Sequence, residues 1–308
     1  MQNLHTSTPV VVHRGLSQAL NKRVWLKLEN TQPSGSFKMR GIGLLCQRAH
    51  AKGARHFVCP SGGNAGYAAA LAGQALGVAT TILVMQATAE SVKQRIAALG
   101  AEVRVAGASW DEIRAAALEL SAQPGHVYIP PFDHPDIWEG NASLIAEAVT
   151  QAEFDAVICS VGGGGLLAGI VQGLHAQNLT QLPVLAVETE GAASLRAALE
   201  AQQLVSLPAI RTIATSLAAN QVAQGTLDWC LRHPVSSHVV SDREAVDACL
   251  RFANDSRMLV EPACGAALAI AYSYAEKLAA YQNPLIVVCG GLGVDLEKLT
   301  SWKTQFAL

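Results

Sequence analysis

Short hydrophobic runs alternate with longer amphipathic segments along most of this chain. The runs are four to six residues long, and several are rich in β-branched residues, as is typical of strands buried in a parallel sheet. Strands followed by helices, repeated in this way, predict an α/β fold with open twisted sheets of mainly parallel strands. The strand candidates lie at 24–29, 56–59, 81–85, 102–106, 156–161, 183–188 and 285–289.

The same pattern divides the chain into two lobes. The stretch 38–136 has its own strand candidates with intervening helices. The segment YIPPFDHPDIWEG at 128–140 is interpreted as the return of the chain to a larger lobe. We therefore expect a small domain at 38–136 and a large domain built from 1–37 and 137–308.

One long stretch, 56–89, contains no Asp, Glu, Lys or Arg. Its length alone would permit a membrane span. The segments PSGGN and LGVATT interrupt its apolar run, so a buried helix followed by a buried strand is the better interpretation. We therefore expect no membrane partner.

Composition narrows the class of protein further. Half of the 308 residues are hydrophobic, enough for a sizeable core, and the net charge of −2 leaves no basic excess for nucleic acid. The seven cysteines are scattered, without a C-x-x-C pair, which favours a reducing cytoplasm over a disulfide framework. The first residues lack the pattern of a secretory signal.

Three glycine-rich segments each follow a strand candidate. They are SGGNAG at 61–66, VGGGGLLAG at 161–169 and CGGLG at 289–293. The C-terminal ends of parallel strands lie at one edge of a sheet, where open α/β folds bind ligands. We therefore expect these loops and Lys38 to meet at one cleft.

The glycine run Gly162–Gly165 leaves backbone N–H groups uncovered just before a helix that starts near Leu166. Such donors at the positive end of a helix dipole suit a phosphate group. Close packing of a helix on a strand also selects glycine, so packing is the alternative explanation.

The same loop permits a second function. Gly163, Gly165 and Ala168 fit the pattern G-x-G-x-x-A, and Glu188 lies about where such folds place the residue that binds a ribose. This interpretation would make the protein an NAD-dependent oxidoreductase. Against it, the loop lies in the middle of the chain, whereas the pattern usually opens its nucleotide-binding unit.

Lys38 has an unusual setting among the lysines, because small residues and an aromatic ring surround it in PSGSFKMRG. A desolvated amine loses proton affinity and can form a Schiff base with an aldehyde. An aldehyde cofactor that carries a phosphate would explain both Lys38 and the glycine run. Ser61 and Asn64 suit a substrate carboxylate, or simply cap a helix. Cys289 is either a buried structural thiol or a neutral neighbour of the cofactor ring.

At these residues the chain resembles the fold-type II pyridoxal-phosphate enzymes, and within them the mammalian-type L-serine/L-threonine dehydratases. The resemblance spans nearly the whole chain and follows the family's order of motifs. It implies a fold like that of the tryptophan synthase β subunit. The motifs are LKLENTQPSGSFKMRGIG, FVCPSGGNAG, YIPPFDHPDIWEGNAS, SVGGGGLLAGIVQGL, LVEPACGAALA and VVCGG.

The resemblance also implies a role for each site residue. Lys38 would carry pyridoxal 5′-phosphate as a Schiff base and then act as the base on the substrate Cα. The large domain would bind the cofactor and the small domain would lie on the substrate side. Cofactor contacts are implied for Phe37, Asn64, Gly162, Gly163, Gly164, Gly165, Leu166 and Cys289, and contacts with the substrate carboxylate for Ser61, Gly62, Asn64 and Ala65.

Family members also hold a monovalent cation near the phosphate loop, which suggests K⁺ here. Two departures stand out. Gly62 replaces the small side chain usual in vigorous dehydratases of this group, and Leu292-Gly293 replaces a Ser-Asn pair. The positions that match the cation ligands are Gly162, Glu188, Ala192, Ser194, Leu217 and Ala219.

These observations lead to one expected function and two alternatives. We expect a cytoplasmic homodimer that deaminates L-serine and L-threonine to 2-oxo acids and ammonia by β-elimination. One alternative is the NAD-dependent oxidoreductase. The other is a relative that binds the cofactor but turns over slowly, because of Gly62.

Overall fold

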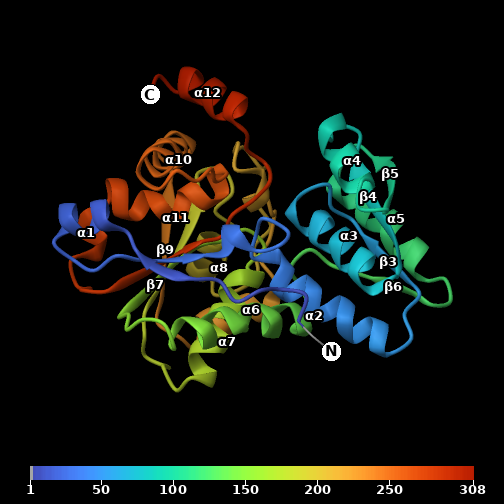
Figure 1. The fold of residues 1–308 in the computed structure, drawn as a ribbon, viewed down its shortest axis with the longest axis horizontal. Coiled ribbons are helices and arrows are strands. Elements are labelled where there is room, and N and C mark those ends of the chain that lie inside the picture. Colours follow the sequence, from blue (N-terminus) through green and yellow to red (C-terminus); the bar gives the residue numbers. More distant parts are fainter. Residues whose placement is uncertain (1–2) are drawn as a thin grey trace.

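Two α/β lobes make up the protein, as Figure 1 shows for the computed structural model, which describes residues 3–308. The larger lobe contains a six-stranded sheet in which only the first two strands are antiparallel. Its order is β1 (Val10–Val12), β2 (Trp25–Leu28), β10 (Pro284–Val288), β7 (Ala156–Ser160), β8 (Val184–Thr189) and β9 (Val235–Val240).

The smaller lobe contains a four-stranded sheet that is parallel throughout. All of its strands lie inside the stretch 38–136, whose boundaries as a domain stay a prediction. The order is β5 (Glu102–Gly107), β4 (Ala79–Met85), β3 (His56–Cys59) and β6 (His126–Tyr128).

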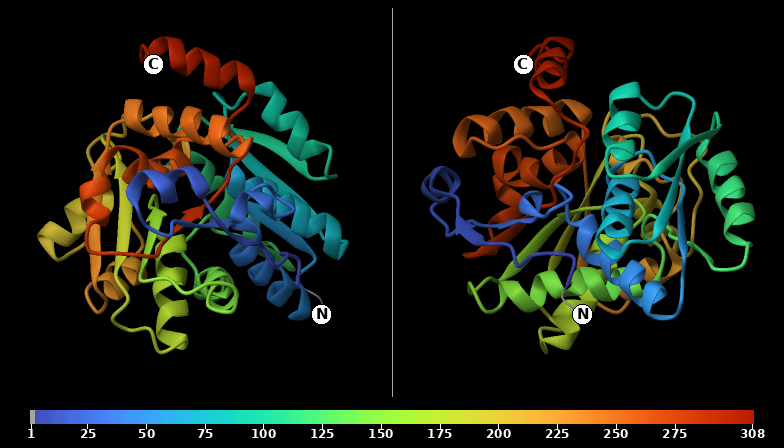
Figure 2. Two further views of the ribbon diagram at one scale, coloured as in Figure 1. Left: turned by 60° about the vertical axis from the view of Figure 1, so that its left-hand side comes forward. Right: turned by 45° about the vertical axis from the view of Figure 1, so that its right-hand side comes forward.

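Helices cover both faces of the large sheet. In Figure 1, α10 and α11 lie above this sheet, and α6 and α7 lie below it. Both views of Figure 2 place α12 outermost, beyond these upper helices. The helices of this lobe are α1 (Arg14–Leu20), α6 (Pro135–Ala148), α7 (Gly165–Ala176), α8 (Ser194–Ala201), α9 (Gln224–Cys230), α10 (Asp242–Ser256), α11 (Pro262–Ser273) and α12 (Leu296–Gln305).

Four further helices lie in the small lobe or between the lobes, and three short 3-10 turns complete the described elements. The alanine-rich helix α3 packs closely on its sheet because it carries little side-chain bulk. A Cβ on Gly66 would lie 1.7 Å from the carbonyl oxygen of Ser61, and one on Gly73 would lie 2.0 Å from Thr80 Oγ1. The elements are α2 (Lys38–Ala51), α3 (Asn64–Leu76), α4 (Glu90–Ala97), α5 (Trp110–Ser121), η1 (Glu29–Thr31), η2 (Thr215–Leu217) and η3 (Ala275–Leu278).

Glycines also bring α2, α6 and α7 into close contact. A Cβ on Gly41 of α2 would lie 2.5 Å from the carbonyl oxygen of Ile137 on α6. On the other side of α6, a Cβ on Gly169 of α7 would lie 2.4 Å from Asn141 Cβ. This backbone-to-backbone packing fixes the helix that begins with Lys38 against the large lobe.

All seven predicted strands are present, and the α/β fold is confirmed. Three further strands were not predicted: β1, β6 and β9. Two of them have only three residues, and β9 carries two serines and a histidine in its six residues VSSHVV. Their side chains are mostly half-buried or exposed, so they lack the continuous hydrophobic run of a buried strand.

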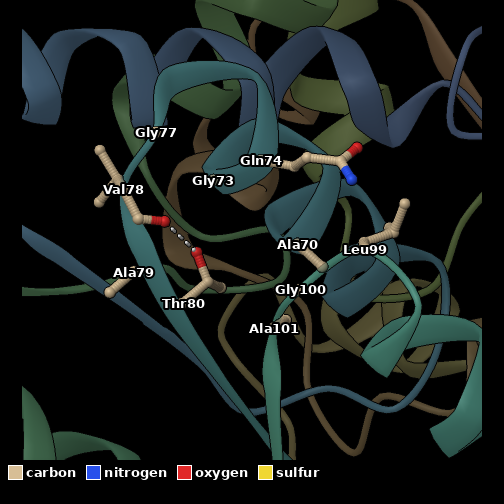
Figure 3. A pocket seen from close by; sticks show the side chains of 10 residues that line it. All are labelled: Ala70, Gly73, Gln74, Gly77, Val78, Ala79, Thr80, Leu99, Gly100 and Ala101. Carbon is tan, nitrogen blue, oxygen red and sulfur yellow. Dashed lines mark hydrogen bonds between the residues drawn. The ribbon is translucent and has the colours of Figure 1, made fainter.

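A pocket of about 270 Å³ lies on the small lobe, where α3 ends and β4 and β5 begin (Figure 3). Small residues such as Gly73, Gly77 and Gly100 line it, and the Thr80 hydroxyl there donates to the Val78 carbonyl. The pocket lies at the N-terminal ends of these strands. The glycine loops follow the C-terminal ends, so the pocket is remote from the predicted site.

Within residues 3–308, no helix combines the length and the apolar character that a membrane span requires. The seven cysteines are all buried and unpaired.

Candidate active site

Lys38 is the first residue of α2, and the loop before it is attached to the end of β10. The Phe37 amide donates to the Cys289 carbonyl over 3.1 Å, and the Gly291 amide donates to the Gly35 carbonyl over 2.9 Å. Gly35 adopts a φ of +70°, a conformation that glycine tolerates best. The loop therefore brings Lys38 to the C-terminal end of a central strand.

The Lys38 amine lies in a desolvated setting. It donates to the Pro131 carbonyl and lies 5.2 Å from the centroid of the Phe37 ring. Desolvation lowers its pKa to about 8, although the nearby Cys59, Cys289 and Glu261 oppose the shift. Roughly a tenth of the amine is then neutral at pH 7, so Lys38 can act as a nucleophile or a base.

The glycine run joins β7 to α7 and presents unpaired donors. Among the described residues, no acceptor pairs with the backbone amides of 162–166. Gly164, the N-cap of α7, has a φ of +91°. Five such amides at the start of a helix fit a phosphate group, as the sequence predicted.

Packing against three neighbours also requires these glycines. A Cβ on Gly163 would lie 2.5 Å from the Phe132 ring, and one on Gly164 would lie 2.4 Å from Thr226 Oγ1. A Cβ on Gly162 would lie 2.9 Å from the Cα of Leu217. The two explanations of the run, phosphate binding and close packing, are therefore compatible.

Asn64 begins α3 in the small lobe and reaches across to the large lobe. Its Nδ2 donates to Glu261 Oε1 over 2.9 Å and to Ser216 Oγ over 3.2 Å, and its Oδ1 accepts from the Leu292 amide over 2.8 Å. In residues 3–308, the backbone amides of Asn64 and Ala65 have no acceptor. They remain available for a carboxylate.

Gly62 and Ser61 form the turn before α3. The Ser61 hydroxyl accepts from the Gly63 amide over 3.3 Å. A methyl group added at Gly62 would lie 3.0 Å from Thr88 Cγ2 and 3.2 Å from Val84 Cγ1. Both contacts are tight, so the absence of a side chain at Gly62 has a packing reason.

Cys289 follows β10 and is buried. Its thiol lies 3.9 Å from the Gly290 carbonyl oxygen. A hydrogen bond with Cys264 and burial raise the pKa of the thiol well above its usual value. Cys289 is therefore neutral at physiological pH, as a neutral partner of a ring nitrogen must be.

Glu188 is the second-last residue of β8 and is completely buried. Its carboxylate accepts from the amides of Leu195 over 2.7 Å and Arg196 over 2.9 Å, at the start of α8. Burial outweighs these bonds and raises its pKa to about 7. The carboxylate is thus occupied by α8, which argues against its predicted role in binding a ribose.

Two of the predicted cation ligands, Gly162 and Ser194, lie on segments that adjoin Glu188. Val161 donates to the Val187 carbonyl, so Gly162 and Glu188 leave neighbouring strands at the same edge. The Ser194 hydroxyl is buried and has no partner among the described residues. A buried, unpaired hydroxyl at the start of the helix that bonds Glu188 is compatible with oxygen ligation of a monovalent cation. No cluster of three His, Cys, Asp or Glu side chains occurs in the described chain.

Several residues of the site were not singled out by sequence reasoning. They are Glu261, Ser216, Pro131, Phe132 and Thr226, which contact the predicted residues from other elements. Glu261 and the Pro131-Phe132 pair lie inside motifs that signalled the family, but single residues in loops gave no separate signal. Burial of Glu261 raises the pKa of its carboxyl, while Ser216, Gly293 and Asn64 oppose the shift by hydrogen bonding.

The site combines a lysine of lowered pKa, a neutral thiol and a loop of free amides, which defines a protein that binds a phosphorylated aldehyde. Comparison with known proteins agrees, because the family described as pyridoxal-phosphate dependent enzyme matches residues 1–290. The chain belongs to this family.

Individual proteins of the family are similar to this chain over nearly its whole length. The chain is 47% identical to a serine dehydratase-like protein of Rattus norvegicus, over 98% of this chain and 94% of that protein. It is 45% identical to the L-serine dehydratase/L-threonine deaminase of Homo sapiens, over 99% and 96%. A fungal L-serine ammonia-lyase from Rhizomucor miehei superimposes with a TM-score of 0.94 at 36% identity, covering 99% of this chain and 100% of that one.

Proposed function

We propose that this protein deaminates L-serine and L-threonine by β-elimination, giving pyruvate and 2-oxobutanoate together with ammonia. The desolvated Lys38 amine beside the unpaired amides of 162–166 carries this proposal. The names of the relatives support the choice of substrates. The dinucleotide alternative has little support, because Glu188 is buried against α8.

When bound, pyridoxal phosphate supplies an aldehyde that forms a Schiff base with an amine and a ring that withdraws electrons from the substrate Cα. The residues present fit this group. Lys38 would bond its aldehyde carbon, and the amides from Gly162 to Leu166 would hold its phosphate. Phe37 and Asn64 would contact the ring and its hydroxyl, and Cys289 would face the ring nitrogen.

The protein residues then have distinct tasks in the reaction. The free amides of Asn64 and Ala65, with Ser61 and Gly62, would bind and orient the substrate carboxylate. Lys38 would remove the Cα proton, a task suited to an amine with a pKa of about 8. The neutral thiol of Cys289 would leave the ring nitrogen unprotonated, which favours loss of the β-hydroxyl over transamination. The released enamine hydrolyses to the 2-oxo acid and ammonia.

Four further parts of the proposal draw on the sequence pattern and on the family resemblance. They are the homodimer, the cytoplasmic location, the division into a large cofactor-binding domain and a small substrate-side domain, and the K⁺ site. A third function, cofactor binding with slow turnover, is kept because Gly62 lacks the side chain usual in vigorous dehydratases of this group.

Absorbance spectroscopy tests the cofactor, and an activity assay tests the reaction. Wild-type protein incubated with pyridoxal phosphate near neutral pH should gain a visible Schiff-base band, and borohydride should fix the label on Lys38. Lys38→Ala should lose both the band and the release of pyruvate from L-serine. A wild-type spectrum without the band, or normal deamination by Lys38→Ala, would contradict the proposed function.

A further inference from the structure

We propose that Glu261 is a positioning residue that fixes the side-chain amide of Asn64 across the two lobes. This inference rests on the proposed cofactor site, in which Asn64 contacts the cofactor. Glu261 is the N-cap of α11 in the large lobe, whereas Asn64 is the first residue of α3 in the small lobe. The contact therefore links the large lobe to the small lobe.

Donor and acceptor chemistry allows only one orientation of the Asn64 amide. The Leu292 N–H can only donate, so it requires the amide oxygen, which lies 2.8 Å away. The Glu261 carboxylate can only accept, so it requires the amide nitrogen, which lies 2.9 Å away. A flipped amide would lose both bonds, which makes the carboxylate the group that fixes the orientation.

The surrounding loop is shaped around the Glu261 carboxylate. Its Oε2 accepts from the Gly293 amide over 3.0 Å, and the Ser216 hydroxyl also bonds to it. Gly291 adopts a φ of +127°, and a Cβ there would lie 2.0 Å from Glu261 Cδ. The glycines after Cys289 thus make room for this side chain.

The Glu261 carboxylate forms no salt bridge, although the charge of Lys38 attracts it at longer range. No Lys, Arg or His of the described chain lies within ion-pair distance of it, and the side chain is 4% exposed. A buried anion that forms no salt bridge lowers stability unless hydrogen bonds satisfy it. A salt bridge therefore does not account for the residue, whereas the orientation of Asn64 does.

One N–H of Asn64 is committed to the carboxylate, and the other points to Ser216. The second bond is the longer of the two, at 3.2 Å against 2.9 Å. Ser216 is exposed, so its hydroxyl can readily turn to water instead. The second N–H is therefore the donor that Glu261 directs toward a ligand oxygen.

An exchange of the two side chains tests the direct contact. Asn64→Asp places two carboxylates 2.9 Å apart and should lower the Tm of the cofactor-free protein by about 4 °C or more. In the double variant, which combines Asn64→Asp with Glu261→Gln, the glutamine NH₂ donates to the introduced aspartate and its oxygen accepts from Gly293. The double variant should therefore regain at least half of the lost Tm.

Cofactor binding tests the positioning role. In Glu261→Gln, one donor always faces another donor, whichever way the two amides turn. We expect the dissociation constant for pyridoxal phosphate, measured by absorbance titration well below each Tm, to rise about tenfold. It should stay raised in the double variant, since the aspartate has no N–H to offer.

Asp155→Asn is a matched control, because Asp155 accepts from the amides of Gln282 and Asn283 at the opposite end of the large sheet. It should lower the Tm without changing cofactor affinity. Glu261→Gln binding within twofold of wild type, or a double variant no more stable than Asn64→Asp, would overturn the inference. A wild type without the Schiff-base band would instead refute the proposed function, while the Tm comparison would still decide whether the contact exists.

Discussion

At the scale of single residues, two side chains of the site lower the stability of the folded protein. Lys38 is held where desolvation disfavours its charge, and Glu261 is a buried carboxyl group that forms no salt bridge. Both features reduce stability in the absence of ligands, and both fit a protein whose site is arranged for chemistry.

Replacement of Lys38 should stabilise the cofactor-free protein in a pH-dependent way. The folded pKa, about 8, lies below the usual lysine value of 10.5, so the charge is disfavoured in the folded state. The full penalty applies below about pH 8 and is relieved as the pH rises toward 10.5. Lys38→Met should therefore raise stability by about 1 kcal/mol at pH 7, allowing for partial exposure.

Thermal unfolding at pH 7 and pH 10 measures this effect. The gain corresponds to roughly 2 °C in Tm at pH 7 and should shrink at pH 10. Lys52→Met, at an exposed position just after the same helix, is the control and should show no such dependence. A Lys38→Met protein less stable than wild type at pH 7 would contradict the expectation.

Gly62 offers a second prediction at this scale. If the missing methyl group leaves the substrate loosely placed, a misplacement of about 1 Å can cost on the order of a hundredfold in rate. Gly62→Ala should then raise kcat for L-serine without changing cofactor affinity. Because the new methyl would press on Thr88 Cγ2 at 3.0 Å, the rise should be larger when combined with Thr88→Ser.

Steady-state kinetics with L-serine and L-threonine tests whether Gly62 leaves the substrate loosely placed. Thr88→Ser alone is the control. A kcat for L-serine that is unchanged or lower in both Gly62→Ala proteins would refute the misplacement account. Selective loss of L-threonine turnover would indicate instead that Gly62 makes room for the larger substrate.

Sequence reasoning at this scale worked where chemistry is concentrated in a motif. Lys38 and the glycine run have neighbours in the chain that already mark them as unusual. Glu261 has no such signal, because its partners Asn64, Ser216 and Gly293 are distant in sequence. Only the fold brings these polar groups together.

At the scale of elements, the end of β8 carries the buried carboxylate of Glu188 and the start of α8 carries the unpaired hydroxyl of Ser194. If Glu188 and Ser194 take part in a cation site, K⁺ should raise the Tm of the protein relative to choline at equal ionic strength. Glu188→Gln and Ser194→Ala should each abolish most of this difference.

Ser194→Ala also provides an internal check. Without K⁺ it should be as stable as wild type or more so, because it removes a buried hydroxyl that lacks a partner. Equal Tm values for wild type in K⁺ and in choline would argue against the cation site.

Hydrophobic patterning predicted the elements well where strands are buried on both faces. All five residues are buried in β7 and in β10, so each strand appears in the sequence as a continuous hydrophobic run. The short strands β1 and β6 lie at sheet edges, where exposed positions interrupt the run. Their pairing partners, rather than their own composition, make them strands.

At the scale of the whole molecule, a buried ionic network attaches the helix of Lys38 to the large lobe. Arg40 on α2 bonds Glu29 over 2.7 Å and Glu147 of α6 over 2.7 Å. Lys27 of β2 also bonds Glu147, over 2.8 Å. The side chains of Arg40, Lys27 and Glu29 are fully buried.

Removal of Arg40 should therefore destabilise the protein strongly. Arg40→Met leaves two carboxylates with one lysine, and loss of one partner from a buried network typically costs about 3–5 kcal/mol. Arg48→Met is the matched control on the same helix, since Arg48 pairs with Asp136 and Glu139 near the surface and should cost at most about 1 kcal/mol. Chemical denaturation of both variants measures the difference, and equal losses would contradict this account.

The order of strands and helices in the sequence predicted two lobes. It did not predict that α2 is bound to the large lobe. Charged residues such as Arg40 and Glu29 look like surface positions in the sequence. The predicted boundary between 37 and 38 assigns α2 to the small domain, yet this network and the glycine contacts with α6 bind it to the large lobe. Ion pairs between residues far apart in the chain produce no periodic pattern of hydrophobic and polar positions, so the sequence does not predict them.

The glycine run has a consequence for the mutational history of this loop. A side chain at Gly162 would collide with the backbone of Leu217, and one at Gly165 would collide with the backbone of Phe132. No substitution at Leu217 or Phe132 can remove these backbone atoms. Gly163 is closed by the Phe132 ring, a side chain that can change. A side chain at 163 is therefore tolerated only after residue 132 has become smaller, so the effect of one change depends on another made earlier. While phenylalanine remains at 132, position 163 stays closed to other amino acids.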